Sequence, residues 1–127
     1  MIQEQFNINI FSNDPTFCTS LATECNKFGF SLTFFEEKDI ESKGRSVSSL
    51  ISVNIIDLDL VEINPYGMVK KLRINSNLPI FGVFSNFSKQ SQAKAEKAGF
   101  DLVFTKSMLI KSVKRIIIHI SNDKRNA

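Results

Sequence analysis

The sequence has few of the side chains that build disulfides and metal centres, with two cysteines and one histidine in 127 residues. Cys18 and Cys25 lie in a segment whose apolar spacing predicts one helix. Seven residues of helix would put their Cα atoms about 10 Å apart, and a disulfide cannot span that distance. There is no Cys-x-x-Cys pair, so we expect no zinc site and interpret both thiols as small core side chains.

Long apolar runs are also absent. No stretch approaches the roughly 20 apolar residues of a membrane span, and the start of the chain, MIQEQF, lacks the basic residues and apolar segment of a signal peptide. These absences favour a cytoplasmic protein that does not use a membrane as a partner. Because 43% of the residues are hydrophobic, the chain can build one core. We expect a single domain over residues 1–127, with a core over about 6–120 and a polar tail over 121–127.

The motifs of common enzymes and nucleotide-binding proteins are missing as well. The sequence has no Gly-x-Gly-x-x-Gly loop, no glycine-rich phosphate cradle followed by Lys-Ser/Thr, and no Ser-His or Cys-His pair at a plausible spacing. His119 lies in an apolar run near the C-terminus, which favours packing over catalysis. An enzyme or a nucleotide binder therefore stays a disfavoured alternative.

Positive charge gathers near the C-terminus of a chain whose formal net charge is +3. From Lys106 onward there are six basic residues and one acid, Asp123. Such a segment could meet an acidic partner or a phosphate backbone, but an exposed amphipathic face that continues into a linker is the simpler interpretation. Direct nucleic-acid binding is the weaker alternative.

Hydrophobic periodicity predicts alternating strands and helices. We expect strands over residues 6–11, 31–35, 53–58, 78–85 and 101–105. Helices are predicted to start after Asp14, near Pro65, after a cap at Ser88 and after a cap at Ser107, and residues 36–50 read as a short or frayed helix. This alternation favours a parallel sheet, whose ligands bind where the strands end. The strand-end residues are Ser12, Asn13, Asp14, Asp57, Phe84, Ser85 and Lys106.

These landmarks together resemble the response-regulator receiver domain, a flavodoxin-like module that accepts a phosphoryl group from a histidine kinase. They are "NIFSNDP", "IIDLDL", "LPIFGVFS", "AGFD" and "FTK", and the resemblance covers about residues 6–120. It implies a three-layer α/β/α sandwich with a doubly wound, five-stranded parallel sheet in the order 2-1-3-4-5. It also implies that Asp57 stands at the phosphoacceptor position and Lys106 at that of the lysine that contacts the phosphoryl group.

The sequence departs from the receiver pattern where the chemistry takes place. The acidic pair that holds Mg²⁺ in the family falls on Ser12 and Asn13, and neighbouring Asp14 is better explained as a helix cap than as a metal ligand. The position at which the family has a Ser or Thr, whose hydroxyl contacts the phosphoryl group, is occupied here by Phe84. Ser85, one residue later, is the alternative. Because the acidic metal ligands are missing, we expect no Mg²⁺ and no other cofactor. Phosphoryl transfer relies on charge neutralisation by the metal, so we also expect this reaction to be lost.

Two hypotheses follow from the resemblance. In the first, the chain is a degenerate receiver, or pseudoreceiver, that is not an enzyme and signals by binding a protein or a second copy of itself, with Asp57 and Lys106 as a structural ion pair. In the second, it is a working phosphoacceptor with a histidine kinase as its partner, and Asp14 and Asp57 hold Mg²⁺. Asp59 is interpreted as a loop residue whose backbone alone would matter.

The resemblance also indicates where a partner would bind. Receivers commonly use the face formed by their fourth helix, fifth strand and fifth helix, here about residues 88–99, 101–105 and 107–122. The residues predicted on it are Phe87, Lys94, Lys97, Phe104, Lys111, Lys114 and Arg115. For any one of them, an exposed basic face remains the simpler interpretation.

Overall fold

The computed structural model describes residues 6–34, 51–60, 64–75 and 78–125. The predicted helix over 36–50 lies outside these ranges. The strands are β1 (Phe6–Phe11), β2 (Ser31–Phe34), β3 (Ile51–Asp57), β4 (Ile80–Phe84) and β5 (Leu102–Thr105). The helices are α1 (Pro15–Lys27), α3 (Pro65–Asn75), α4 (Lys89–Ala98) and α5 (Lys106–Arg125). No helix in these ranges is both long enough and apolar enough to cross a membrane.

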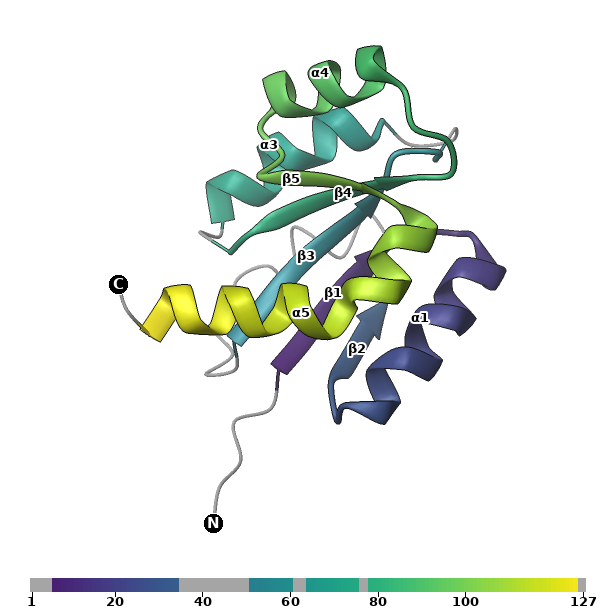
Figure 1. The fold of residues 1–127 in the computed structure, drawn as a ribbon. Coiled ribbons are helices and arrows are strands. Elements are labelled where there is room, and N and C mark those ends of the chain that lie inside the picture. Colours follow the sequence, from purple (N-terminus) through teal and green to yellow (C-terminus); the bar gives the residue numbers. More distant parts are fainter. Residues whose placement is uncertain (1–5, 35–50, 61–63, 76–77, 126–127) are drawn as a thin grey trace.

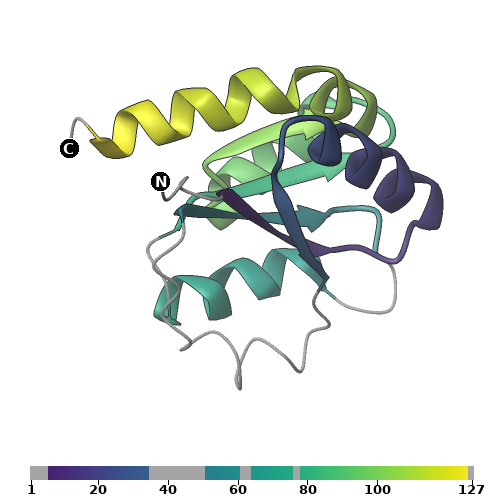
Figure 2. The ribbon, with the colours of Figure 1, turned by 90° about the horizontal axis from the view of Figure 1, so that it is seen from below.

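The five strands form one parallel sheet in the order β2-β1-β3-β4-β5, which confirms the predicted fold. α1 and α5 cover one face, and α3 and α4 cover the other (Figure 1). Seen from below, the sheet lies between α5 and α3 (Figure 2). Because all strands run in the same direction, their carboxyl ends meet at one edge, and this edge carries the candidate site.

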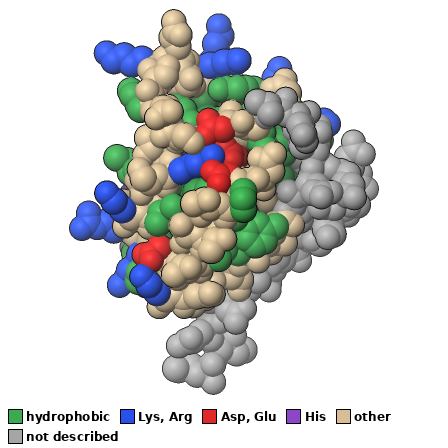
Figure 3. All heavy atoms as spheres, turned by 90° about the vertical axis from the view of Figure 1, so that its right-hand side faces the viewer, with side chains coloured by type: hydrophobic (Ala, Val, Ile, Leu, Met, Phe, Trp, Pro, Cys, Tyr) green, Lys and Arg blue, Asp and Glu red, His purple; other side chains and the backbone are tan. Residues whose placement is uncertain are grey.

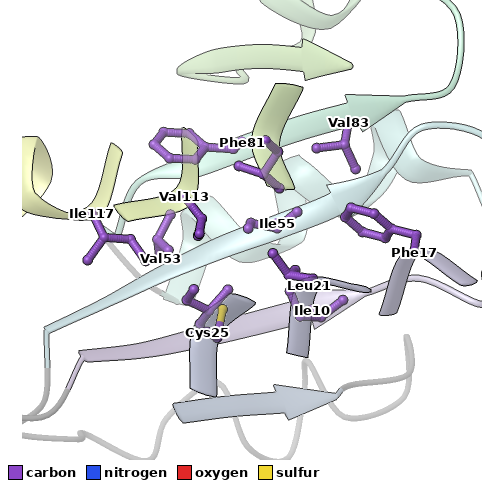
Figure 4. Close-up of a cluster of buried hydrophobic side chains, with 12 residues drawn as sticks. Ile10, Phe17, Leu21, Cys25, Val53, Ile55, Phe81, Val83, Val113 and Ile117 are labelled. Carbon is purple, nitrogen blue, oxygen red and sulfur yellow. The ribbon is translucent and has the colours of Figure 1, made fainter. Parts of the chain in front are cut away.

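The larger core lies between the sheet and the pair α1 and α5 (Figure 4). Alternate residues of the strands face it, as period-2 side-chain geometry requires. Cys25 of α1 is fully buried there, and burial raises the pKa of its thiol to about 12. Both cysteines are free, as the sequence predicted, and Cys25 is a core residue while Cys18 is partly exposed.

The second core lies between the opposite face of the sheet and the helices α3 and α4. Here Gly82 of β4 lets two large side chains lie directly over the strand. A Cβ at this position would come within 2.9 Å of Leu58 Cδ1 and 3.1 Å of Phe100 Cδ1. The absent side chain is therefore what allows this core to close over the middle of the sheet.

The starts of the helices explain the local folds that frame the site. Asp14 caps α1, because its side chain accepts a hydrogen bond from the Phe17 amide at 3.1 Å. The predicted cap at Ser107 is wrong: α5 begins at Lys106, and the hydroxyl of Thr105 accepts from the Met108 amide at 3.2 Å. β5 thus passes into α5 without a loop, which places Lys106 at the edge of the sheet. α5 also continues to Arg125, into the segment predicted to be a polar tail.

Candidate functional site at the carboxyl edge of the sheet

Four charged residues from three parts of the chain meet at the carboxyl edge of the sheet. Asp14 follows β1, Asp57 ends β3, Asp59 lies two residues later, and Lys106 begins α5. Figure 3 faces this edge and shows acidic side chains gathered around a basic one. The topology therefore brings together residues that are up to 92 positions apart in the sequence.

The ammonium group of Lys106 lies among three carboxylates. Its Nζ is 3.0 Å from Asp14 Oδ2, 3.0 Å from Asp57 Oδ2 and 3.1 Å from Asp59 Oδ2, and its side chain is 11% exposed. Burial works to lower the pKa of Lys106, but the hydrogen bonds to the three carboxylates outweigh it and hold the pKa well above its usual range. Lys106 is thus fully charged at neutral pH, and the ion pair with Asp57 predicted from the sequence is present.

Asp57 has donors on both of its oxygen atoms. Oδ1 accepts from the Asp59 amide at 2.9 Å, and Oδ2 accepts from the Ser12 hydroxyl at 2.6 Å in addition to Lys106. The Ser12 oxygen in turn accepts from the Asp14 amide at 3.1 Å. The side chain of Asp57 is 1% exposed. A buried carboxylate needs such a complete set of partners, because an unpaired buried charge is costly.

The side chains near Asp57 that could serve as magnesium ligands already have partners within the protein. Mg²⁺ requires an octahedral shell of oxygen ligands, usually with one or two carboxylates and several waters. Ser12 offers a neutral hydroxyl that already donates to Asp57, and Asp14 is engaged by the Phe17 amide and by Lys106. Among the described residues there is no group of three His, Cys, Asp or Glu side chains that could hold a metal ion. The ammonium of Lys106 supplies the positive charge at this place.

Asp59 is the functional residue that reasoning from the sequence missed. Its side chain, not only its backbone, belongs to the site, because Oδ2 accepts from the Ser85 amide at 2.9 Å and from the Ser85 hydroxyl at 2.8 Å. The pattern in "IIDLDL" does not reveal this, because β3 ends at Asp57 and Asp59 follows in a turn, where strand alternation no longer fixes the direction of a side chain.

The two residues predicted at the phosphate-contacting position have different surroundings. Phe84 is buried in the core under α3 and α4, in the same cluster as Phe11, Leu58 and Met68. Ser85, the first residue after β4, lies at the edge and bonds to Asp59. The hydroxyl nearest to the charged cluster on this strand is therefore that of Ser85.

The residues predicted to form one interaction surface point in several directions. The Lys94 ammonium lies over the Tyr66 ring of α3 at 4.3 Å, and the Lys114 ammonium lies over the Phe28 ring at 5.2 Å, next to α1. Phe104 is half-buried against Phe81 at a centroid distance of 5.5 Å. Exposed positions include Phe87, Lys97, Lys111 and Arg115, together with Leu102 and Met108, which the sequence did not single out.

Comparison with known proteins supports the fold through structure alone. No protein-family model matches the sequence, and no curated protein sequence matches it. A two-component response regulator from Clostridium difficile has a TM-score of 0.78 at 19% identity, over 93% of this chain and 97% of that chain. The beryllofluoride-activated NtrC4 receiver domain dimer has a TM-score of 0.65 at 12% identity, over 83% and 93%.

A third similar structure contains a phosphorylated residue. It is a response regulator from Burkholderia pseudomallei with a phosphorylated aspartic acid, a calcium ion and citrate. Its TM-score is 0.72 at 14% identity, and the match covers 96% of this chain and 72% of that chain. At these identities, the comparisons establish that the chain has the flavodoxin-like fold of receiver domains.

Proposed function

We propose that this protein is a pseudoreceiver: a signalling module with the receiver fold that acts by binding another protein, without Mg²⁺-dependent phosphorylation of Asp57. It would not be an enzyme, and it would need no cofactor. Receiver modules respond to kinases inside the cell, so the proposal includes a cytoplasmic location. The resemblance in sequence and the shared fold support the receiver part of this proposal.

The observation that carries the rest is the environment of Asp57. A phosphoacceptor must present a free carboxylate oxygen to its donor, and phosphoryl transfer depends on positioning and on neutralisation of charge. Here the Ser12 hydroxyl and Lys106 occupy Oδ2, and the Asp59 amide occupies Oδ1. With 1% of its side chain exposed, Asp57 is better explained as a structural anchor than as a nucleophile.

A partner surface near α4, β5 and α5 is the second part of the proposal. The large apolar side chains of Phe87, just before α4, of Leu102 on β5 and of Met108 on α5 are 58%, 48% and 55% exposed. The partner is either another protein or a second copy of the chain. The NtrC4 receiver domain, which shares the fold, forms a dimer, and sedimentation of the purified chain over a range of concentrations distinguishes the two.

The experiment that tests the central claim uses acetyl phosphate as a small phosphodonor. The wild-type chain is incubated with acetyl phosphate and Mg²⁺, and its intact mass is measured. We expect no added phosphoryl group, and titration calorimetry should show no Mg²⁺ binding at millimolar concentrations. Phosphorylation of Asp57 in the wild type would establish the alternative, a phosphoacceptor with a histidine kinase as its partner.

A designed variant provides the positive control. Ser12→Asp together with Asn13→Asp restores the acidic pair that the resemblance implies and removes the hydroxyl that bonds to Asp57. We expect this variant to bind Mg²⁺, because carboxylate oxygens are the ligands that this ion prefers. The same variant with Asp57→Asn should bind it more weakly, which would show that Asp57 lies at the restored site.

A further inference from the structure

One oxygen atom of Asp59 connects three separate elements of the fold. Oδ2 accepts from the Ser85 amide at 2.9 Å, from the Ser85 hydroxyl at 2.8 Å and from Lys106 Nζ at 3.1 Å. Asp59 follows β3, Ser85 follows β4, and Lys106 begins α5. The carboxylate therefore ties the end of one strand to the end of the next strand and to the start of a helix.

The chemistry of this contact makes it strong for an accessible group. An amide, a hydroxyl and an ammonium all donate to an ionised carboxylate, and charge-assisted bonds are about twice as strong as bonds between neutral groups. Partial burial works to raise the pKa of Asp59, but the hydrogen bonds from Ser85 and Lys106 outweigh it and lower the pKa below its usual range. The tie is therefore charged and complete at neutral pH.

Ser85 opens the connection between β4 and α4. The connection ends at Ser88, whose side chain caps α4 by accepting from the Ser91 amide at 3.3 Å. Between these two fixed points lies Phe87, with its ring centroid 6.1 Å from that of the buried Phe84. The bonds to Asp59 at one end and the helix cap at the other thus define the position of a largely exposed aromatic ring.

We propose that Asp59 is a conformational latch that holds residues 85–88 against the ends of β3 and β5, so that Phe87 and the start of α4 are presented in one position without modification of the chain. Asp59 is 41% exposed, whereas Asp57 is 1% exposed. The latch can therefore open to solvent without disrupting the core, and the two carboxylates have separate tasks. That Phe87 is presented to a partner rests on the proposed function; the latch itself does not.

Amide hydrogen exchange on the full chain tests the latch. In Asp59→Ala the Ser85 amide loses its acceptor, and we expect its exchange to become about tenfold faster, as for the loss of one or two hydrogen bonds. The NMR signals of residues 85–88 should also shift. The Leu58 amide, which donates to the Val83 carbonyl at 2.7 Å, should keep its protection, because the sheet itself is unchanged.

The matched control is Asp14→Asn. It removes another carboxylate from Lys106, but asparagine caps a helix about as well as aspartate, and the side chain of Asp14 bonds to the Phe17 amide and to Lys106, not to the Ser85 donors that Asp59 holds. Exchange at Ser85 should therefore remain at the wild-type rate. Equal rates in wild type and Asp59→Ala, or equal loosening in Asp14→Asn and Asp59→Ala, would overturn the proposal. Should Asp59→Ala fail to fold, Asp59→Asn takes its place: it keeps an acceptor oxygen but not the charge, so exchange at Ser85 should be faster than in the wild type, by less than about tenfold.

A pH titration tests whether the Ser85 amide is bonded to the ionised carboxylate of Asp59 in solution. In the wild type, the Ser85 amide proton shift should follow the ionisation of Asp59, with a midpoint below the usual carboxyl range. A Ser85 shift that does not titrate would contradict the latch. None of these readouts involves a modified Asp57, so phosphorylation of Asp57 would overturn the proposed function and leave the latch standing.

Discussion

At the scale of single residues, the site is governed by one ammonium shared among three carboxylates. Asp57 is the most buried of the three, and its charge is tolerated because Lys106, Ser12 and the Asp59 amide all donate to it. Asp14 and Asp59 lie nearer to solvent. Removal of the Lys106 ammonium should therefore destabilise the buried charge of Asp57 most.

We predict that Lys106→Met lowers the free energy of unfolding at pH 7 by about 3–5 kcal/mol, the usual cost of breaking a buried ion pair on one side. Methionine retains the apolar stem, so the loss reports the charge. The deficit should shrink as the pH falls towards 4, because protonation of the carboxylates relieves their repulsion. Urea denaturation at pH 7 and at pH 4 measures both effects.

The matched control for this prediction is Lys27→Met. Lys27 also pairs with a carboxylate, Glu24, at 2.6 Å, but its side chain is 60% exposed. Surface pairs of this kind contribute about 0–1 kcal/mol. A loss in Lys106→Met no larger than that in Lys27→Met would show that the charged cluster does not stabilise the fold.

The residues of the cluster were predictable from the sequence to different degrees. Asp57 and Lys106 end predicted strands, and a parallel sheet brings strand ends together, so their pairing followed from topology. The position of the Asp59 side chain did not follow from topology. Asp59 lies past the end of β3, where strand alternation no longer fixes the direction in which a side chain points. Its position depends on the Ser85 donors, which come from a different strand.

At the scale of the elements, the glycines show which backbone positions the fold constrains. Gly99 ends α4 with a φ of 117°, a conformation that side-chain-bearing residues rarely adopt. Gly67 lies inside α3, and a Cβ added there would meet nothing closer than 3.4 Å. The same substitution at the two sites should therefore have opposite effects.

We predict that Gly99→Ala destabilises the protein by about 1–3 kcal/mol, because of backbone strain at positive φ. Gly67→Ala should stabilise it by about 0.5–1 kcal/mol, since alanine is the better helix former. Thermal unfolding of the two variants beside the wild type measures both. Stabilisation by Gly99→Ala would contradict the assigned end of α4.

The order and type of the described elements were predictable, whereas several boundaries were not. Alternation along β1 and β3 and helical spacing along α1 are strong local signals. The start of α5 was misjudged because Ser107 resembles a cap, while the chain passes from strand to helix with Thr105 as the residue that bonds to the Met108 amide. A local pattern does not reveal whether a loop separates two elements.

At the scale of the whole molecule, the predicted partner surface is more divided than the sequence indicated. Lys94 lies over the Tyr66 ring and Lys114 over the Phe28 ring, at two different helices. Sequence position places a residue on a helix, but the neighbouring aromatic ring decides which way a long side chain lies. The number of charged residues alone could not predict the directions in which Lys94 and Lys114 lie.

The charged cluster should set the pH range over which the whole domain is stable. The helix-capping bond from the Phe17 amide and the bond from Lys106 lower the pKa of Asp14, and the pKa of Asp59 is also lowered. Such groups stabilise the fold above their unfolded pKa of about 4, and this stability is lost as the pH falls through their folded values. Lys106, with its raised pKa, stabilises the fold below about pH 10.4 and ceases to do so at higher pH.

We therefore predict that the contribution of these groups to the free energy of unfolding is constant between about pH 5 and 9, falling below about pH 4 and above about pH 10. In the double variant Asp14→Asn/Asp59→Asn, the free energy of unfolding should fall less steeply below about pH 4, because two carboxylates no longer take up protons on unfolding. In Lys106→Met, the free energy of unfolding should fall less steeply above about pH 10, because Lys106 no longer loses its proton there. Urea denaturation across this range measures all three chains. If the free energy of unfolding changes with pH at the same slope in the wild type and in both variants, groups outside the cluster set the pH limits of the fold.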